Sequence, residues 1–128
     1  EGGGQILRTA TGLSAVTGKA CRIHNIREGR SRPGLRPQHL RGIKGLAEIT
    51  GAELEGAEIG SAEVNFQPRE LNPPESMKLK VGTAGSVTLV LQGLLIALCA
   101  APGTTRIEVT GGTHVKWSPV VEYLQSVF

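Results

Sequence analysis

The stretch MKLKVGTAGSVTLVLQGLLIALCAAPGTTRIEVT, residues 77–110, decides the fold class of this chain. Residues 77–81 alternate apolar and polar positions, which predicts a half-buried strand. Residues 85–100 are mostly apolar and predict a helix that is buried on most sides. After a turn at Pro102-Gly103, residues 105–110 predict another strand. A strand, a helix and a strand in succession indicate an α/β fold (α+β layered), with helices packed on sheets.

The first half of the chain predicts a similar succession. Helices are expected over residues 5–17 and 38–50, each followed by a glycine that is a natural helix end. Short strands are expected over residues 20–26, 53–58 and 62–66. The unit from Gly4 to Ile26 nearly matches the length of the unit from Gly85 to Val109. The chain therefore contains an internal repeat of organisation.

A last helix is expected to begin at the Ser118-Pro119 corner and to run to the end of the chain. Serine is a favoured helix cap, and proline is favoured in the first helical turn. This helix follows the second predicted strand and the Gly111-Gly112 pair, so it belongs to the second copy of the repeat.

The composition is that of a globular domain. The chain has 128 residues, of which 39% are hydrophobic and 20% charged. No apolar run is long enough to cross a bilayer, and no signal peptide opens the chain, so a cytoplasmic protein without membrane contact is expected. Cys21 and Cys99 stand among apolar residues, which predicts buried thiols. The chain has no aspartate, which excludes a Ser–His–Asp triad, and its three histidines lack the spacing of a zinc site.

Charge is strongly segregated along the sequence. Eight basic residues lie between positions 19 and 44 with only Glu28 against them: Lys19, Arg22, Arg27, Arg30, Arg32, Arg36, Arg41 and Lys44. Between positions 48 and 75 there are seven glutamates and only one basic residue, Arg69. Such segregation concerns binding partners, and the basic segment is suited either to phosphates or to a solvated surface.

Residues 27–40, REGRSRPGLRPQHL, form the strongest local signal for a binding site. Four arginines lie within ten residues, in a loop stiffened by two prolines. Guanidinium groups bind phosphate through paired hydrogen bonds and keep their charge. Glu1-Gly-Gly-Gly-Gln5 precedes a predicted helix, whose N-terminus could bind an anion, although it is not a Walker A sequence. Glu1 alone could hold a divalent ion beside substrate phosphates.

Taken together, these segments resemble the RNA 3'-terminal phosphate cyclase family. The similar blocks occur in the family order over nearly the whole chain: EGGGQILR (1–8), IREGR (26–30), PGLRPQHL (33–40), LEGAEIGS (54–61), TAGS (83–86) and GGT (111–113). The resemblance implies repeated βαβαββ units. Residues 1–75 would be the first unit without its first strand, and residues 76–128 the start of the second. The insert domain and the C-terminal unit would be absent from this chain.

The resemblance also implies a reaction. ATP adenylates a histidine of the enzyme, and the adenylate passes to the RNA 3'-phosphate to give RNA(3')pp(5')A. The neighbouring 2'-hydroxyl then forms the 2',3'-cyclic phosphate and expels AMP. ATP, Mg²⁺ or Mn²⁺ and an RNA 3'-phosphate end are the implied cofactors and partners. The family's nucleophilic histidine matches none of His24, His39 and His114, so this segment alone is expected to be inactive.

Site roles carry over to the positions that match the family motifs. Arg8, Arg27, Arg30 and Gln38 would bind phosphate, of the RNA end or of ATP. Glu1 would hold the metal and orient nucleotide phosphates, and Gln92, Ser118 and Pro119 would lie along the adenosine. Arg36 and His39 would be neighbours of the site.

Other functions remain as alternatives. One is a non-catalytic, cyclase-like protein of ribosome biogenesis, although such relatives lack the EGGGQ block and the intact arginine loop. Another is a plain RNA-binding module, against which the low aromatic content of 3% argues. A third is a different enzyme of a related repeat fold, such as an enolpyruvyl transferase. Missing later repeats would expose apolar helix faces, so self-association of the chain is also expected.

Overall fold

The computed structural model describes residues 3–127, and its secondary structure mixes helices and strands. The helices are α1 (Gly4–Thr17), α2 (Pro37–Thr50), α3 (Val87–Ala100) and α4 (Val121–Val127). The strands are β1 (Cys21–Ile23), β2 (Glu53–Glu55), β3 (Val64–Gln67), β4 (Ser76–Ser86) and β5 (Arg106–Gly112). The α/β class predicted from the sequence is confirmed, whereas the division into βαβαββ units stays a prediction.

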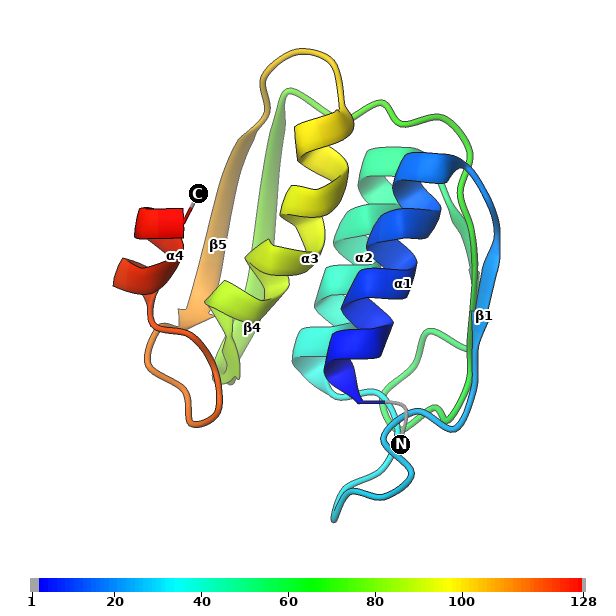
Figure 1. Cartoon of the computed structure of the whole chain (residues 1–128), viewed down its shortest axis with the longest axis vertical. Helices are drawn as coiled ribbons and strands as arrows, with labels where there is room; N and C mark the ends of the chain where they lie inside the picture. The colour runs from blue at the N-terminus through cyan, green and yellow to red at the C-terminus, as the bar shows by residue number, and fades with distance from the viewer. Residues whose placement is uncertain (1–2, 128) are drawn as a thin grey trace.

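The helices α1, α2 and α3 lie between two small sheets (Figure 1). One sheet has the strand order β1-β3-β2, and its neighbouring strands are antiparallel. In this sheet Phe66 of β3 pairs with Cys21 of β1 on one side and with Leu54 of β2 on the other. The other sheet is the parallel pair β4-β5, in which Leu79 pairs with Val109. The segment β4–α3–β5 is thus a strand–helix–strand unit, as residues 77–110 predicted, and its two strands pair in parallel.

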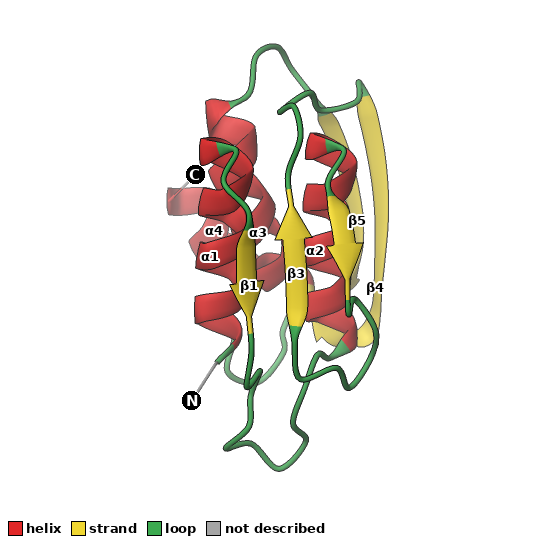
Figure 2. Ribbon diagram, turned by 90° about the vertical axis from the view of Figure 1, so that its right-hand side faces the viewer, coloured by secondary structure: helices red, strands yellow, loops and turns green. Residues whose placement is uncertain are grey.

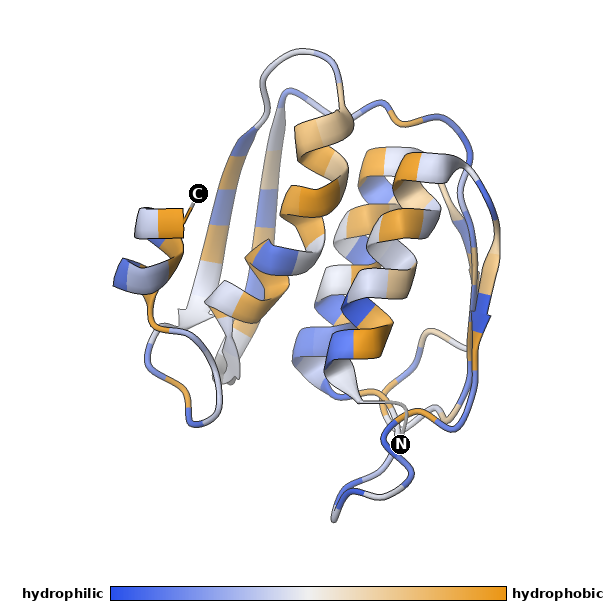
Figure 3. Ribbon diagram, viewed as in Figure 1, coloured by the Kyte–Doolittle hydropathy of each residue, from blue (hydrophilic) through white to orange (hydrophobic). Residues whose placement is uncertain are grey.

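Alternation along the strands explains how the sheets pack on the helices. In β4, Met77, Leu79 and Val81 are buried while Lys78 and Lys80 are exposed. The same alternation colours β4 and β5 in Figure 3. On the other side of the helices, Figure 2 shows β1 and β3 side by side in front of them. The inward side chains of both sheets close one core with the helices.

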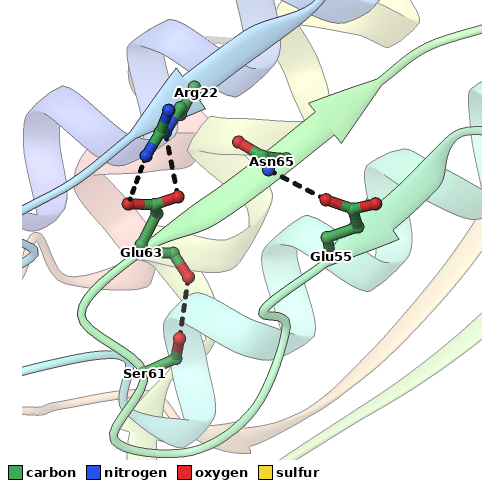
Figure 4. Close-up of polar contacts among 5 residues, drawn as sticks. All are labelled: Arg22, Glu55, Ser61, Glu63 and Asn65. Carbon is green, nitrogen blue, oxygen red and sulfur yellow. Dashed lines mark hydrogen bonds and ion pairs between the residues drawn. The ribbon is translucent and has the colours of Figure 1, made fainter.

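The outer face of the β1-β3-β2 sheet is polar and internally paired (Figure 4). Arg22 binds Glu63 through two hydrogen bonds of 2.9 and 3.0 Å, and Asn65 donates to Glu55 at 3.0 Å. The neighbouring residues of β3, Val64 and Phe66, are almost fully buried. One face of this sheet therefore builds the core and the other meets water.

The two glycine stops predicted from the sequence are confirmed. Gly18 and Gly51 take left-handed φ values of 72° and 64°, and each donates its N–H back to the helix it ends, to Ser14 and Ala47. Helix α3 begins at Val87, two residues later than expected, because Ser86 caps it by accepting from the Leu89 N–H at 3.3 Å.

Helix α1 buries a narrower face than its sequence suggests. Leu7, Thr11 and Ala15 point into the core, and the Thr11 hydroxyl donates to the Leu7 carbonyl at 2.8 Å. Ile6 and Leu13, which contribute to its helical apolar pattern, are 56% and 52% exposed. An apolar strip of α1 is thus left on the surface.

Several expected boundaries are wrong for local backbone reasons. The strand predicted over residues 20–26 ends at Ile23, because Asn25 and Arg27 adopt a φ of 54°, which is incompatible with a strand. Gly56 and Gly60, at φ values of 73° and 83°, separate β2 from β3 and shorten both predicted strands. Strand β4 instead continues to Ser86 through an irregular register.

The last helix and the cysteines also differ from expectation. Helix α4 begins at Val121, and the Ser118 hydroxyl donates to the Val115 carbonyl at 2.7 Å, so Ser118 closes a turn and does not cap the helix. Cys21 is half-buried and Cys99 is exposed, and both are free thiols. Burial raises the pKa of Cys21, with a hydrogen bond to Ser14 opposing it. Within residues 3–127, no helix is long and apolar enough to span a membrane.

Candidate functional site

Three helices begin at the same end of the molecule. Figure 1 shows α1, α2 and α3 running side by side, with their first residues Gly4, Pro37 and Val87 toward the lower end. The first turn of a helix leaves backbone N–H groups without intrahelical partners and carries a partial positive charge. Three such ends together create a region that favours an anion.

A cleft of about 830 Å³ opens at this end. Its lining combines the start of α1, the arginine loop with the start of α2, the end of β4 with α3, and the turn after β5. The lining residues are Gly4, Gln5, Arg8, Arg27, Arg30, Arg32, Arg36, Pro37, Gln38, His39, Val81, Gly82, Gly85, Leu89, Val115, Lys116 and Trp117. Among residues 3–127, six of the lining side chains are cationic and none is a carboxylate.

The arginine loop (residues 27–36) is anchored near both of its ends. Ile26 and Leu35 are buried in the core at 1% and 0% exposure. The Leu35 N–H donates to Ser61 at 2.9 Å, and the Gly60 N–H donates to Leu35 at 2.7 Å. Gly34, at φ 79°, passes so close to Gly60 that a Cβ there would lie 2.2 Å from the Gly60 carbonyl oxygen. Only glycine fits at position 34, because a side chain there would clash with the Gly60 backbone. This close approach of Gly34 to Gly60, here called the Gly34–Gly60 crossing, positions the loop at the cleft.

Arg27 has a structural role within this loop as well as a place in the cleft. Its Nη1 donates to the Arg32 carbonyl at 2.6 Å and to the Gly34 carbonyl at 3.2 Å. Burial lowers the pKa of Arg27, and the charges of Arg36 and Arg30 lower it further. The neighbouring arginines therefore repel one another, and an anion between them would relieve that repulsion.

Arg8 presents a buried donor without a partner. Its Nη2 donates to Gln5 at 2.8 Å, but its Nε is inaccessible and makes no hydrogen bond within residues 3–127. Burial also lowers the pKa of Arg8. Buried polar groups of proteins are nearly always paired, so the unpaired Nε–H of Arg8 is an exception in the described part of the chain.

His39 stands at the floor of the cleft as a neutral ring. It is 7% exposed, and burial together with the charges of Arg27, Arg8 and Arg36 lowers its pKa to about 4. Its Nδ1 accepts the Arg36 backbone N–H at 3.1 Å, so its Nε2 carries the proton in the neutral ring. A Cβ on Gly4 would lie 2.8 Å from that Nε2, so the glycine lets the ring and α1 approach closely.

Gln38 joins two of the converging helices. Its Oε1 accepts the Ser86 backbone N–H at 3.0 Å, which links the start of α2 to the cap of α3. With the oxygen engaged, the amide nitrogen of Gln38 remains as the donor that a ligand in the cleft can use.

The structure brings together most of the residues that the sequence predicted. Arg8, Arg27, Arg30 and Gln38 line one cleft, and so do their predicted neighbours Arg36 and His39. They come from α1, the loop and α2, and only the fold makes them adjacent.

The predicted adenosine residues lie beside this cleft, not in its lining. Thr88 of α3 donates to the Pro119 carbonyl at 2.7 Å, which holds the Ser118–Pro119 corner against α3. Gln92 lies one helical turn after Thr88 and is half-buried. Glu1, the predicted metal ligand, lies outside the described residues. Within residues 3–127, no group of three or more His, Cys or Glu side chains is placed to hold a metal.

The sequence alone did not predict a site role for several other residues of the cleft, among them Arg32, Lys116 and Trp117. Arg32 had been counted in the basic segment, but Lys116 and Trp117 stand about 80 positions further along the chain. Nothing in the segment around Trp117 pointed to this cleft, although Trp117 is the only tryptophan of the chain.

Comparison with known proteins identifies the family of this chain. A sequence model of the family described as RNA 3'-terminal phosphate cyclase matches residues 1–128. The chain belongs to the RNA 3'-terminal phosphate cyclase family. A protein of that name from Methanopyrus kandleri is 57% identical over 123 residues, which cover 96% of this chain and 35% of the relative.

Two further relatives carry the same name. The protein from Pyrococcus furiosus is 55% identical over 127 residues, 99% of this chain and 37% of the relative. The protein from Thermococcus gammatolerans is 54% identical over 127 residues, 99% of this chain and 36% of the relative. The chain thus spans little more than a third of the length of the curated cyclases that it matches.

Proposed function

We propose that this chain is the phosphate-binding part of an enzyme that converts an RNA 3'-terminal phosphate to a 2',3'-cyclic phosphate with ATP. The observation that carries the proposal is the cleft in which Arg8, Arg27, Arg30 and Arg36 meet three helix N-termini. Membership of the cyclase family supports it. A divalent or polyvalent phosphate is the anion that this number of donors suits best.

The chemistry begins with a phosphate that is a poor electrophile. Transfer of AMP from ATP through an enzyme histidine, with release of pyrophosphate, would convert the RNA 3'-phosphate to RNA(3')pp(5')A. Attack of the terminal 2'-hydroxyl on the 3'-phosphorus then forms the cyclic diester and breaks the bond to AMP. The hydroxyl proton leaves to solvent or to a base, and AMP is the leaving group.

The residues of this chain would bind and orient phosphates in that sequence. Arg30 and Arg8 would neutralise the phosphate oxygens, and Gln38 would donate its amide N–H. The neutral Nε2–H of His39 adds a donor without adding charge. Holding the phosphate beside its own 2'-hydroxyl would supply the positioning that such transfers depend on.

The other expected features stay predictions. The cationic lining of the cleft would suit the phosphates of ATP, whereas the described lining has no carboxylate for Mg²⁺ or Mn²⁺, so a metal site rests on Glu1 alone. The nucleophilic histidine is not expected among His24, His39 and His114. Classification of the enzyme as a ligase type and a cytoplasmic location are also part of the proposal.

The test is an end-conversion assay with the protein at its natural length. An RNA labelled at its 5' end and carrying a 3'-phosphate is incubated with ATP and Mg²⁺, and its 3' end is then treated with phosphatase. We expect an ATP-dependent, phosphatase-resistant product, and no product from an RNA ending in a 3'-hydroxyl. The substitution Arg30→Ala should lower the rate at limiting RNA by about 10-fold or more, since one charge-assisted contact contributes about 1.5–3 kcal/mol.

Arg22→Ala is the matched control. It removes an arginine from the paired outer face of the β1-β3-β2 sheet and should leave the rate nearly unchanged. Binding of the 3'-phosphate end without any ATP-dependent conversion would point instead to a non-catalytic RNA-binding protein.

A further inference from the structure

Trp117, at the rim of the cleft, has an unusually exposed side chain and a strained backbone conformation. It is 90% exposed, more than any other large apolar side chain of residues 3–127. Its backbone has a φ of 66°, in the left-handed region that bulky side chains rarely adopt. Residues held in such conformations cluster at binding sites, where the surrounding structure maintains them.

The turn that carries Trp117 is well defined. The Ser118 N–H donates to the Val115 carbonyl at 3.1 Å, so residues 115–118 form a β-turn with Trp117 at its third position. That position usually takes glycine when φ is positive. The Ser118 hydroxyl bonds the same carbonyl, and the Pro119 carbonyl accepts the Thr88 hydroxyl of α3 at 2.7 Å. The turn that carries the indole is therefore constrained and anchored to α3 through Pro119.

The chemistry of the neighbourhood suits one kind of ligand. Trp117 and Lys116 line the same cleft as Arg8 and Arg30. The Lys116 ammonium lies 5.4 Å from the centre of the indole ring. A cleft with guanidinium groups and a flat aromatic surface matches a nucleotide, which joins a phosphate to a flat base.

We infer that Trp117 is a stacking platform for the base of a nucleotide whose phosphate binds among the arginines of the cleft. The inference rests on the proposed function and adds recognition of the base to that of the phosphate. The base can come from the RNA 3' end or from ATP, and both offer the same flat ring. The stacking contact is independent of base identity, because every base has such a face.

The experiment uses the fluorescence of Trp117 and the affinity of variants, with the protein at its natural length. Four probes are compared: an RNA with a 3'-phosphate, the same RNA with an abasic 3'-terminal nucleotide, ATP, and inorganic triphosphate. We expect the RNA or ATP to quench the Trp117 signal, taken as the difference from Trp117→Phe, and the two probes without a base to leave it unchanged. Quenching by the RNA, by ATP or by both identifies the source of the base.

Trp117→Gly is the decisive variant, because glycine accepts the positive φ and preserves the turn. Its affinity for the base-bearing probe should fall by about 10-fold, with no change for the base-free probe. Tyr123→Ala, which removes an exposed aromatic of α4 outside the cleft lining, should change neither affinity.

Failure of the stacking inference can be distinguished from failure of the proposed function. If Trp117→Gly binds the base-bearing probe as tightly as the unaltered protein and no probe quenches fluorescence, stacking is refuted while phosphate binding stands. If the 3'-phosphate makes no difference to affinity and Arg30→Ala has no effect, the proposed function itself is refuted.

Discussion

Arginines have opposite surroundings in two regions of this molecule. On the outer face of the β1-β3-β2 sheet, Arg22 pairs with Glu63 and Arg69 pairs with Glu53. In the cleft, Arg8 and Arg30 pair with no carboxylate of residues 3–127. The pKa directions agree with this contrast: the bond to Glu63 raises the pKa of Arg22, whereas burial lowers the pKa of Arg8.

The difference shows that a count of basic residues does not locate a binding site. The arginines of the outer face are paired with glutamates in solvent-exposed positions, so these ion pairs contribute little to stability or to recognition. The cleft gathers uncompensated positive charge beside helix N-termini, and an anion is what balances it. If this contrast decides binding, substitutions in the cleft should weaken it and matched substitutions on the outer face should not.

The largest effect is expected from the double substitution Arg8→Ala with Arg30→Ala. Each lost guanidinium removes contacts worth about 1.5–3 kcal/mol, so affinity for an RNA 3'-phosphate should fall by roughly 10²–10⁴-fold. Fluorescence anisotropy of a labelled RNA measures this affinity, and circular dichroism checks that the fold persists.

The matched double substitution is Arg22→Ala with Arg69→Ala. It removes the same formal charge from the paired outer face and should change affinity by less than about twofold at physiological salt. Equal losses from the two double variants would mean that net charge alone, and not the cleft, determines binding.

Gly34→Ala should destabilise the protein by about 2 kcal/mol or more, because a left-handed φ and a contact with the Gly60 carbonyl both oppose a side chain. Gly29→Ala is the control in the same loop, since a Cβ at Gly29 meets nothing within 4 Å. Urea unfolding measures both. If the two variants unfold alike, the Gly34–Gly60 crossing does not hold the arginine loop in place.

His39 should report the charge of the cleft through its titration. Its pKa is about 4 in the folded protein, below its ordinary 6.5, so it stabilises the fold above pH 6.5 and that stability is lost as the pH falls toward 4. Bound phosphate offsets the arginine charges and should raise this pKa by about one unit. NMR titration of the ring with and without inorganic phosphate measures the shift.

The variant His39→Gln is the control for the stability part of this prediction. It should flatten the loss of unfolding free energy between pH 6.5 and pH 4. A His39 pKa that stays the same when phosphate binds would show that the anion binds elsewhere.

The smallest effect concerns the apolar strip of α1. Ile6, Leu13 and Val16 are exposed on this helix, in contrast to the polar outer face of the sheet. Weak self-association is therefore expected at high concentration, and Leu13→Glu should reduce it. Light scattering measures it, with Lys19→Glu as a charge change beyond the helix end. A clean monomer at high concentration would contradict this expectation.

Local signals in the sequence were sufficient to predict where α1 and α2 end. Gly18 and Gly51 stop α1 and α2 because glycine alone takes a left-handed φ without strain, and this depends on no distant contact. Strand ends were predicted less well. Asn25 and Arg27, which follow β1, adopt positive φ on either side of Ile26, whose N–H donates to the distant Ala62 carbonyl at 3.0 Å.

For the candidate site, too, some features could be predicted from the local sequence and others depend on the fold. The density of arginine and proline in residues 27–40 indicated phosphate binding from sequence alone, because that chemistry belongs to the side chains themselves. The neutral state of His39 could not be predicted, since it depends on burial and on three surrounding arginines. The role of Trp117 was missed because nothing in its own segment resembles the arginine loop.

By itself, the sequence determined the α/β class, the family and the residues able to bind phosphate. The class follows from short-range periodicity, the expected phosphate contacts follow from side-chain chemistry, and the family follows from the resemblance of the sequence blocks. Only the tertiary structure decided which arginines are neutralised by glutamates and which meet at the cleft with Trp117. The physical reason is that charge compensation and desolvation depend on distances between residues that are far apart along the chain.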